Sequence, residues 1–312
     1  MKVLISGSRK AKNRGIIKVV ELMDRITQVR NLIVGRETEI RLAFDSIEKG
    51  IPLIIEGDTG TGKTELAKAI SAVLERPLYR VDGDDSLTAV KLKGWFDPAL
   101  VLEKGYNQDT FVPGPLIRAM TEGGVFFFNE TNRAPSEAVN AVLTALDEKL
   151  VTLPRLASVK AADGFTAIFC VNPTEHIATN PLPRAFHDRC VWITLDHQTL
   201  SEALEIVQLR TQCENDWLLW VACRIVERTR NYSEIEHGAS VRGAIQLVSI
   251  LQESDSISNN WLERVAIAAL SRKIRLRAES TQSEKDVIAR IVREVLKEKP
   301  REEVQEAILS KN

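Results

Sequence analysis

Short apolar runs recur along the middle of the chain and alternate with amphipathic segments. Runs of this length are typical of strands buried on both faces, and amphipathic segments between them are typical of helices that cover a sheet. The pattern predicts a parallel five-stranded sheet with helices on both faces. The five runs are PLIIE (52–56), LYRVD (78–82), VFFF (125–128), AIFCV (167–171) and VWITL (191–195).

The pattern changes on both sides of this region. After about residue 200 the strand signals stop, and apolar residues recur at helical spacing, for example over 218–226. Before the sheet, an apolar stripe over 16–26 predicts one helix, and a second is expected from Glu37 to Glu48. We therefore expect three parts: an N-terminal arm and helix (1–30), an α/β core (31–198) and an all-helical domain (199–312).

Composition narrows the class of protein. The 312 residues suffice for about two domains, and 44% hydrophobic with 27% charged residues is typical of a globular chain. The formal net charge of -1 gives no support to a nucleic-acid partner. No run approaches the ~18 apolar residues of a membrane span, the first residues lack the order of a signal peptide, and the cysteines lack zinc-site spacing. We expect a cytoplasmic protein with reduced thiols.

The segment GDTGTGKT (57–64) follows the first predicted strand and opens the next predicted helix. This is the context that the phosphate-binding motif G-x-x-x-x-G-K-[ST] requires, and it disfavours the alternative of a glycine-rich turn with a surface lysine. Glycines let backbone N–H groups point inward, and the helix N-terminus attracts a triphosphate. We expect Lys63 to neutralise phosphate oxygens and Thr64 to ligate Mg²⁺. The expected nucleotide-binding residues are Gly57, Asp58, Thr59, Gly60, Thr61, Gly62, Lys63, Thr64 and Glu65.

Asn129 and Glu130 come directly after the apolar run at 125–128. In P-loop ATPases this end of a strand supplies one acid for Mg²⁺ and another that orients the attacking water. Glu130 suits the second role as general base. Asn129 suits the metal role poorly, because an amide can accept a hydrogen bond from metal-bound water but brings no charge. The alternative is that the two residues begin a loop and cap the helix near Pro135.

Asn172 follows the run at 167–171, so it should emerge at the same edge of the sheet. There it can hold the attacking water or touch the γ-phosphate, or it can be an ordinary turn residue. The segment PLPRAFHDRC (181–190) places Arg184 and Arg189 on a short predicted helix before the last strand. A guanidinium there could reach the γ-phosphate of a neighbouring subunit, or could simply be solvated.

In the helical domain, Ser240 is predicted as the N-cap of a helix, with Arg242 in the first turn. A cation is unfavourable beside the positive end of the helix dipole, so an anionic partner explains Arg242 better than helix stability does.

Taken together, these segments resemble the MoxR family of AAA+ ATPases, from about Ile33 to Arg277. The GWFDP and DRC details are most similar to the branch associated with maturation of molybdenum-containing carbon monoxide dehydrogenase. The matching segments are IVGRE (33–37), GDTGTGKT (57–64), GWFDPALV (94–101), TFVPGPL (110–116), FFFNETNRAP (126–135), VNP (171–173), LPRAFHDRC (182–190), GASVRGAIQL (238–247) and KIRLR (273–277).

The resemblance implies a P-loop NTPase core followed by an all-α lid, with a role for each matching position. Family members hydrolyse ATP with Mg²⁺ in homo-oligomeric rings, usually hexameric, act as chaperones, and often pair with a von Willebrand factor A domain protein whose client is a metalloenzyme. The implied roles are Walker A for Lys63 and Thr64, the catalytic Walker B acid for Glu130, sensor 1 for Asn172, the arginine finger for Arg189 and sensor 2 for Arg242.

Three positions leave alternatives open. Asn129 stands where the family has an acid, so a second hypothesis is an ATP-gated assembly module that hydrolyses little ATP. The segment 182–185 is LPRA where the family has LPEA, so Arg184 replaces a glutamate and is a second candidate finger. The segment 94–115 corresponds to the family's insertion in helix 2, which is either a client contact toward the pore of the ring or a surface hairpin that shields the sheet. A small-molecule kinase would leave Asn172, Arg189 and Arg242 without a role.

Overall fold

The computed structural model describes residues 22–173, 181–254 and 256–298. The predicted N-terminal arm and most of the first predicted helix lie outside these residues. At the end of that segment, residues 22–30 are helical.

The chain forms two compact units. The first runs to Asp58 and continues from Gly62 to Leu195, and the second consists of Thr59–Thr61 together with the chain from Asp196 onwards. Each unit buries its own apolar side chains, in two clusters on either side of the sheet in the first unit and in one cluster among the helices of the second.

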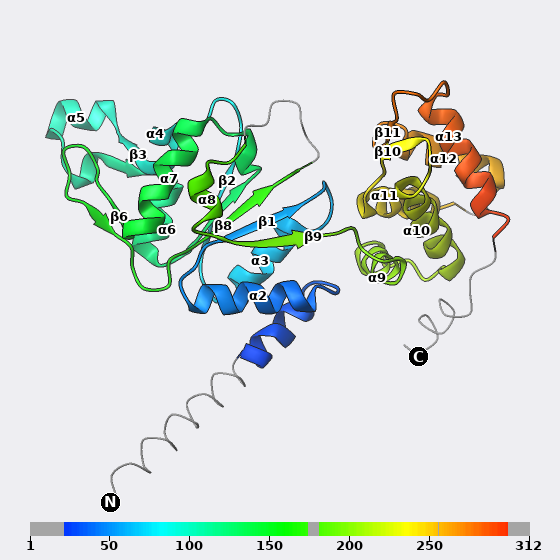
Figure 1. The fold of residues 1–312 in the computed structure, drawn as a ribbon, viewed down its shortest axis with the longest axis horizontal. Coiled ribbons are helices and arrows are strands. Elements are labelled where there is room, and N and C mark those ends of the chain that lie inside the picture. The colour runs from blue at the N-terminus through cyan, green and yellow to red at the C-terminus, as the bar shows by residue number, and fades with distance from the viewer. Residues whose placement is uncertain (1–21, 174–180, 255, 299–312) are drawn as a thin grey trace, which may run out of the picture. The chain divides into compact units, whose positions relative to one another are not determined.

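A parallel sheet of five strands forms the centre of the first unit (Figure 1). The strands lie in the order β2-β5-β8-β1-β9. They coincide, to within one residue at each end, with the five apolar runs of the sequence, so the predicted parallel sheet is confirmed. Their bounds are β1 (Leu53–Gly57), β2 (Leu78–Asp82), β5 (Val125–Asn129), β8 (Thr166–Val171) and β9 (Val191–Leu195).

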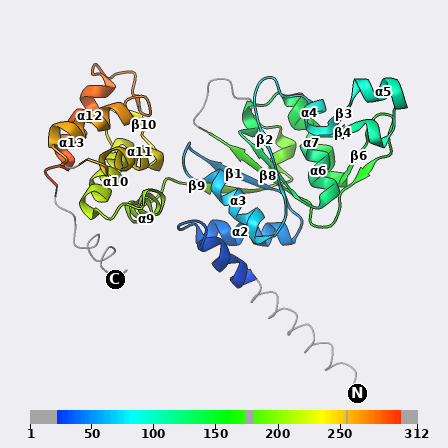
Figure 2. The ribbon, with the colours of Figure 1, turned by 180° about the vertical axis from the view of Figure 1, so that it is seen from behind.

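Helices cover both faces of this sheet, as the sequence predicts. Helices α2 and α3 pack side by side on one face (Figure 2), against strand residues that include Ile55 and Phe127. Helices α4, α6 and α7 pack on the other face, where Phe126, Phe128 and Phe169 form the centre of the core. Their bounds are α2 (Glu37–Glu48), α3 (Lys63–Val73), α4 (Ala89–Lys93), α6 (Pro115–Glu122) and α7 (Ser136–Glu148).

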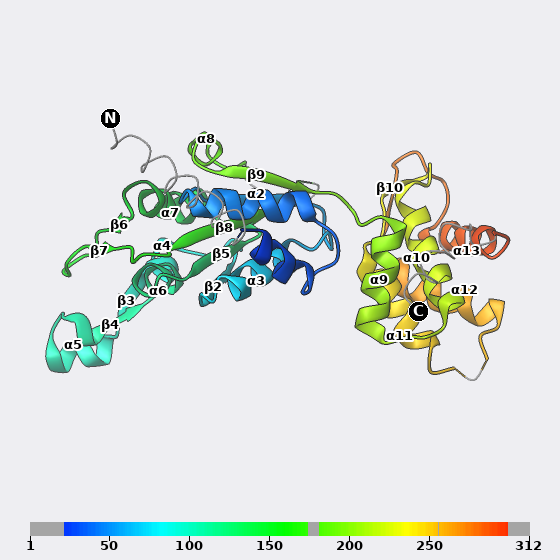
Figure 3. The same ribbon diagram turned by 90° about the horizontal axis from the view of Figure 1, so that it is seen from below.

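The segment after α4 forms an antiparallel hairpin of β3 (Gly94–Phe96) and β4 (Phe111–Pro113). Between these strands lie α5 (Pro98–Lys104) and the short 3₁₀ helix η1 (Gln108–Thr110). Leu102 on α5 lies at the surface and is 90% exposed. This hairpin and α5 occupy one end of the first unit (Figure 3). A second ribbon, β6 (Leu150–Val151) with β7 (Val159–Lys160), follows α7.

The second unit is built on helices around a single core, as the spacing of its apolar residues predicts. The expectation that no strand occurs after residue 200 needs correction, because β10 (Ile235–His237) pairs antiparallel with β11 (Arg275–Leu276). None of the described helices is long and apolar enough to span a lipid bilayer. The helices are α9 (Leu200–Thr211), α10 (Asp216–Arg230), α11 (Val241–Leu251), α12 (Asn259–Leu270) and α13 (Glu284–Val295).

Candidate nucleotide-binding site

The phosphate-binding segment lies between β1 and α3, as the sequence predicts. Gly60 and Gly62 have positive φ angles of 85° and 101°, a backbone conformation that glycine adopts without strain. Helix α3 begins at Lys63, within the phosphate-binding segment itself. Thr64 and Glu65 therefore lie in its first turn, and the N-terminus of a helix favours an anion.

The Lys63 side chain folds back over the loop. Its Nζ donates to the backbone oxygens of Gly57 and Asp58, at 2.5 and 2.9 Å. Binding of a triphosphate would replace these carbonyls with phosphate oxygens, which carry more charge and form stronger hydrogen bonds with an ammonium group. Glu65 pairs at the surface with Lys68 at 3.2 Å, so its contribution to an anion site would come from its backbone N–H.

Asn129 is the last residue of β5, and only 9% of it is exposed. It lies opposite Asp82, the last residue of β2, and its Nδ2 donates to Asp82 Oδ1 at 2.8 Å. Arg80 approaches the same carboxylate, with Nη2 2.6 Å from Oδ1 and Nε 3.0 Å from Oδ2. These donors, Arg80 first and then Asn129, lower the pKa of Asp82 although its partial burial acts in the opposite direction.

The motifs and spacing of the sequence do not single out Asp82, which the structure places beside Asn129. The run LYRVD does end in an acid at the edge where Asn129 emerges, which was the available signal. Periodicity alone does not say that β2 lies next to β5, because strand order in a sheet is a tertiary property.

Glu130 adopts a left-handed backbone with φ 51° and enters the 3₁₀ helix η2 (Thr131–Arg133). Its carboxylate accepts from Arg133 Nη1 at 2.7 Å. Gly83 packs tightly on this turn: its N–H donates to Asn129 O at 2.8 Å, and a Cβ at position 83 would lie 2.2 Å from Glu130 O. The end of β2 therefore holds the turn that carries Glu130.

The alternative in which Asn129 and Glu130 begin a loop and cap the helix near Pro135 is half right: Glu130 begins a turn after β5, but the expected cap does not exist. Pro135 itself occupies the N-cap position of α7, and no side chain makes a cap hydrogen bond there.

Asn172 directly follows β8 and is 6% exposed. Its backbone oxygen accepts from Asn132 Nδ2 at 3.0 Å, which ties it to the segment after Glu130. Val171 pairs with Glu56 in the register of β8 and β1, so Asn172 is level with Gly57, the first residue of the phosphate-binding loop. The sheet thus brings Asn172 to the edge where the sequence places it.

Electrostatics connect these strands on the face that α3 covers. Burial raises the pKa of the Cys170 thiol on β8 to about 12, and the charges of Lys63 and Arg80 act on this thiol in the opposite direction. Cys170 packs on the face of the sheet that α2 and α3 cover. Asn129 lies on this face as well, because Phe127, two residues earlier on β5, packs there.

The predicted short helix before β9 exists as α8 (Arg184–His187), but it carries only one of the two arginines. Arg184 is its exposed first residue, whereas Arg189 lies beyond its end, and this corrects the prediction. The Arg189 guanidinium forms an ion pair with Asp147 on α7 through Nε, and its Nη1 donates to Ala185 O at 2.9 Å. The pair raises the pKa of Arg189 and lowers that of Asp147.

In the second unit, α11 starts where predicted, with Ser240 at the N-cap position and an exposed Arg242 in the first turn. The Ser240 side chain makes no cap hydrogen bond, although a serine there was expected to do so. Sequence alone assigns Ser240 its position but not its rotamer.

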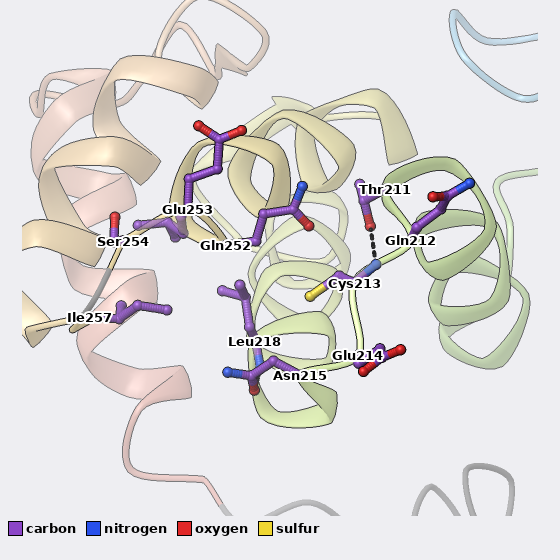
Figure 4. Close-up of a pocket in the computed structure, with 11 residues that line it drawn as sticks. Thr211, Gln212, Cys213, Glu214, Asn215, Leu218, Gln252, Glu253, Ser254 and Ile257 are labelled. Atoms are coloured by element: carbon purple, nitrogen blue, oxygen red, sulfur yellow. Dashed lines mark hydrogen bonds between the residues drawn. The ribbon is translucent and has the colours of Figure 1, made fainter.

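A pocket of about 480 Å³ also lies in the second unit, between the end of α9, the start of α10 and the end of α11. Figure 4 shows its lining, in which Thr211 Oγ1 accepts from the Cys213 N–H at 3.3 Å. None of the predicted site residues lines this pocket. No group of three or more His, Cys, Asp or Glu side chains suited to a metal ion occurs among residues 22–173, 181–254 and 256–298.

Comparison with known proteins agrees with this geometry. Residues 52–190 match the family described as AAA domain (dynein-related subfamily). The chain is 30% identical over 205 residues to an uncharacterized protein of Staphylococcus haemolyticus, covering 64% of this chain and 77% of that protein. It is 29% identical over 223 residues to an uncharacterized protein of Staphylococcus saprophyticus, covering 70% and 84%.

The crystal structure of a proposed ATPase from Cytophaga hutchinsonii has the same fold, with a TM-score of 0.54 and 21% identity, over 92% of this chain and 98% of that chain. The glycine loop between β1 and α3, at the edge of a parallel sheet, defines a P-loop NTPase with a helical C-terminal part. The chain belongs to the AAA+ ATPases.

Proposed function

We propose that this chain is a MoxR-type ATPase that hydrolyses ATP in a homo-oligomeric ring and uses the cycle to remodel or mature a client protein. The observation that carries the proposal is the row of polar groups at one edge of the sheet. The loop after β1, Asn172 after β8, and Asn129 with Glu130 at the end of β5 emerge together there. In parallel sheets, ligands bind outside the carboxyl ends of the strands.

The residues present fit a nucleotide with Mg²⁺. The N–H groups of the first turn of α3 and the Lys63 ammonium suit the phosphates, and the Thr64 hydroxyl is a hard oxygen ligand of the kind that Mg²⁺ prefers. Asn129 would accept a hydrogen bond from metal-bound water. When bound, the ion would neutralise charge on the phosphates.

Glu130 would accept a proton from the attacking water, and Asn172 would orient that water. The Arg133 guanidinium binds one oxygen of the Glu130 carboxylate, and an ion pair of this kind makes the carboxylate a weaker base. Arg189 from an adjacent subunit would stabilise charge on the γ-phosphate, after exchanging Asp147 for the phosphate. Arg242 would link the nucleotide state to the helical unit.

A mixing experiment tests the shared site. Subunits with Glu130→Gln lack the base, and subunits with Arg189→Ala lack the finger, so each preparation alone should be nearly inactive. A mixture of the two should regain part of the parent ATP turnover. In mixed rings, some sites combine Glu130 from an Arg189→Ala subunit with Arg189 from a neighbouring Glu130→Gln subunit. Arg184→Ala is tested in the same mixture, since Arg184 is an exposed arginine five residues away, and the comparison separates the two candidate fingers.

Turnover that stays absent in the mixture, or a parent activity that is unchanged on dilution to monomer, contradicts the shared site. Sedimentation with and without ATP measures ring size, for which we propose a hexamer. Affinity purification identifies the partner, for which we propose a von Willebrand factor A domain protein and a metalloenzyme client, in the cytoplasm.

Asn129 favours a second candidate function, an ATP-gated assembly module with little hydrolysis. A missing charge at the metal can cost about a hundredfold in rate. This candidate predicts ATP-dependent assembly with negligible turnover, and faster turnover in Asn129→Asp.

A further inference from the structure

An asparagine at the end of β5 can present either its amide oxygen or its amide nitrogen to a ligand. Only the oxygen can accept a hydrogen bond from metal-bound water, because the NH₂ group is a donor. Its usefulness therefore depends on what fixes the orientation of the amide.

Asp82 fixes this orientation. An ionised carboxylate can only accept, so Asn129 must turn its Nδ2 toward Asp82, and the 2.8 Å hydrogen bond occupies that group. Asn129 Oδ1 is thereby directed away from β2. The 9% exposure of Asn129 leaves little room for the amide to rotate freely.

Asp82 is itself anchored on the correct face of the sheet. Side chains alternate along a strand, and Val81 packs with the α6 and α7 core, so Asp82 points to the face of α2 and α3. Asn129 points to that face as well, since Phe127, two residues earlier, packs there. The Arg80 guanidinium lies 5.9 Å from the Phe127 ring centre and binds the Asp82 carboxylate through two nitrogens.

The close fit of Gly83 keeps the two strand ends together. Its N–H donates to Asn129 O at 2.8 Å, and its missing side chain lets the β2 end approach the Glu130 carbonyl. The β2 end is thus attached to the β5 end through backbone as well as side chains, at the register Asp82 to Asn129.

We propose that Asp82 is a positioning residue for the nucleotide-bound metal and that it acts through Asn129. The Asp82 carboxylate and the Asn129 amide act as a pair, in which the acid lies on the neighbouring strand. This inference rests on the proposed function, because it requires a metal–nucleotide complex at this edge. It also gives Asn129 a useful role without a charge of its own.

The Asp82–Asn129 pair leads to an unusual prediction about Asn129→Asp. On its own this substitution places two carboxylates at the 2.8 Å contact, where they repel each other, so restoring the acid at position 129 does not improve metal binding. In the exchanged pair Asp82→Asn with Asn129→Asp, an amide again donates to a carboxylate. The exchanged pair should therefore bind the metal at least as well as the parent.

The readout is metal affinity and not turnover. Free Mn²⁺ is titrated by electron paramagnetic resonance into full-length protein saturated with ADP, with thermal unfolding measured in parallel. Removal of a group that orients a metal-binding residue typically costs 10- to 100-fold in affinity, so Asp82→Asn should weaken Mn²⁺ binding about tenfold or more. Asn129→Asp should weaken it as well, and the double variant should recover the parent affinity.

The control is Asp84→Asn, which removes the same charge from an exposed residue in the same segment, where the carboxylate accepts from the Ser86 N–H at 2.6 Å. It should leave Mn²⁺ affinity unchanged. Binding of a fluorescent ADP analogue in EDTA tests the proposed function separately, because it needs the loop but no metal.

If the analogue binds and Mn²⁺ affinity is the same in Asp82→Asn and the parent, the inference is wrong and the proposed function stands. If the analogue fails to bind the parent protein, the proposed function fails. An Asn129→Asp variant that alone binds Mn²⁺ more tightly than the parent also overturns the pairing.

Discussion

Gly83→Ala is the sharpest test of how the β2 end supports the turn that carries Glu130. The backbone of Gly83 does not have a positive φ, so alanine is not strained by its own conformation. The difficulty is steric: the new Cβ would lie 2.2 Å from Glu130 O and 3.0 Å from Glu130 C, both of them backbone atoms. Relief to a contact of at least about 3.2 Å requires a shift of about 1 Å in the Glu130 carbonyl or the β2 end.

The magnitude follows from this displacement. Forcing one methyl group into a packed site costs about 1–3 kcal/mol, which for a unit of this size lowers Tm by roughly 2–12 °C. A misplacement of about 1 Å near a reacting group can reduce the rate about a hundredfold. We therefore expect Gly83→Ala to reduce ATP turnover by about tenfold to a hundredfold while ADP binding at the loop is retained.

Gly105→Ala is a matched control. Gly105 has φ +70° and no atom within 4 Å of an added Cβ, so alanine there is strained but touches nothing. Such strain costs of the order of 1–3 kcal/mol, comparable to the expected loss at Gly83, and it lies in the β3–β4 hairpin segment, away from the turn. Thermal melts and steady-state turnover of both variants are compared. A Gly83→Ala protein with turnover within twofold of the parent would refute the reasoning.

Three further predictions concern charge and thiols. Asp147→Asn should raise turnover at low protein concentration severalfold, because Arg189 no longer has to leave its ion pair to reach a neighbouring subunit; a loss as large as that in Arg189→Ala would contradict this. Burial raises the pKa of Cys170 and Cys223 to about 12, and both residues are almost completely buried, so these thiols should react with a thiol reagent at pH 8 only after unfolding, which timed absorbance measurements would test. The thiol pKa is raised only in the folded state, so the contribution of the neutral buried thiols to the free energy of unfolding is present below about pH 9 and is lost as the pH rises toward 12. Denaturant titrations at a series of pH values would measure this loss.

The five sheet strands and the phosphate-binding loop were predictable from the sequence because their signals are local. A buried strand between two helical layers must be apolar at nearly every position, as in the run from Val125 to Phe128. The loop needs glycines at its positive φ angles and a lysine at the start of α3, all within eight consecutive residues. Helix α2 is another local pattern, and its predicted bounds agree with the structure.

Short elements escaped prediction. Strand β10 has three residues and β11 has two, and strands this short show no alternating pattern of apolar and polar residues. A long stretch of chain also separates them. Arg189 lies beyond α8 because this helix is only four residues long, and helix ends are the least certain part of a prediction from sequence.

The sequence by itself determined that an anion-binding loop opens a helix and that polar residues end several strands. Tertiary structure alone decided which of those strands are neighbours. Asp82 and Asn129 are 47 residues apart in the chain, and only the order of the sheet makes them hydrogen-bonded partners. The physical reason is that side-chain pattern fixes which face of a strand is buried, while lateral order depends on how the helices and connections pack over the whole sheet.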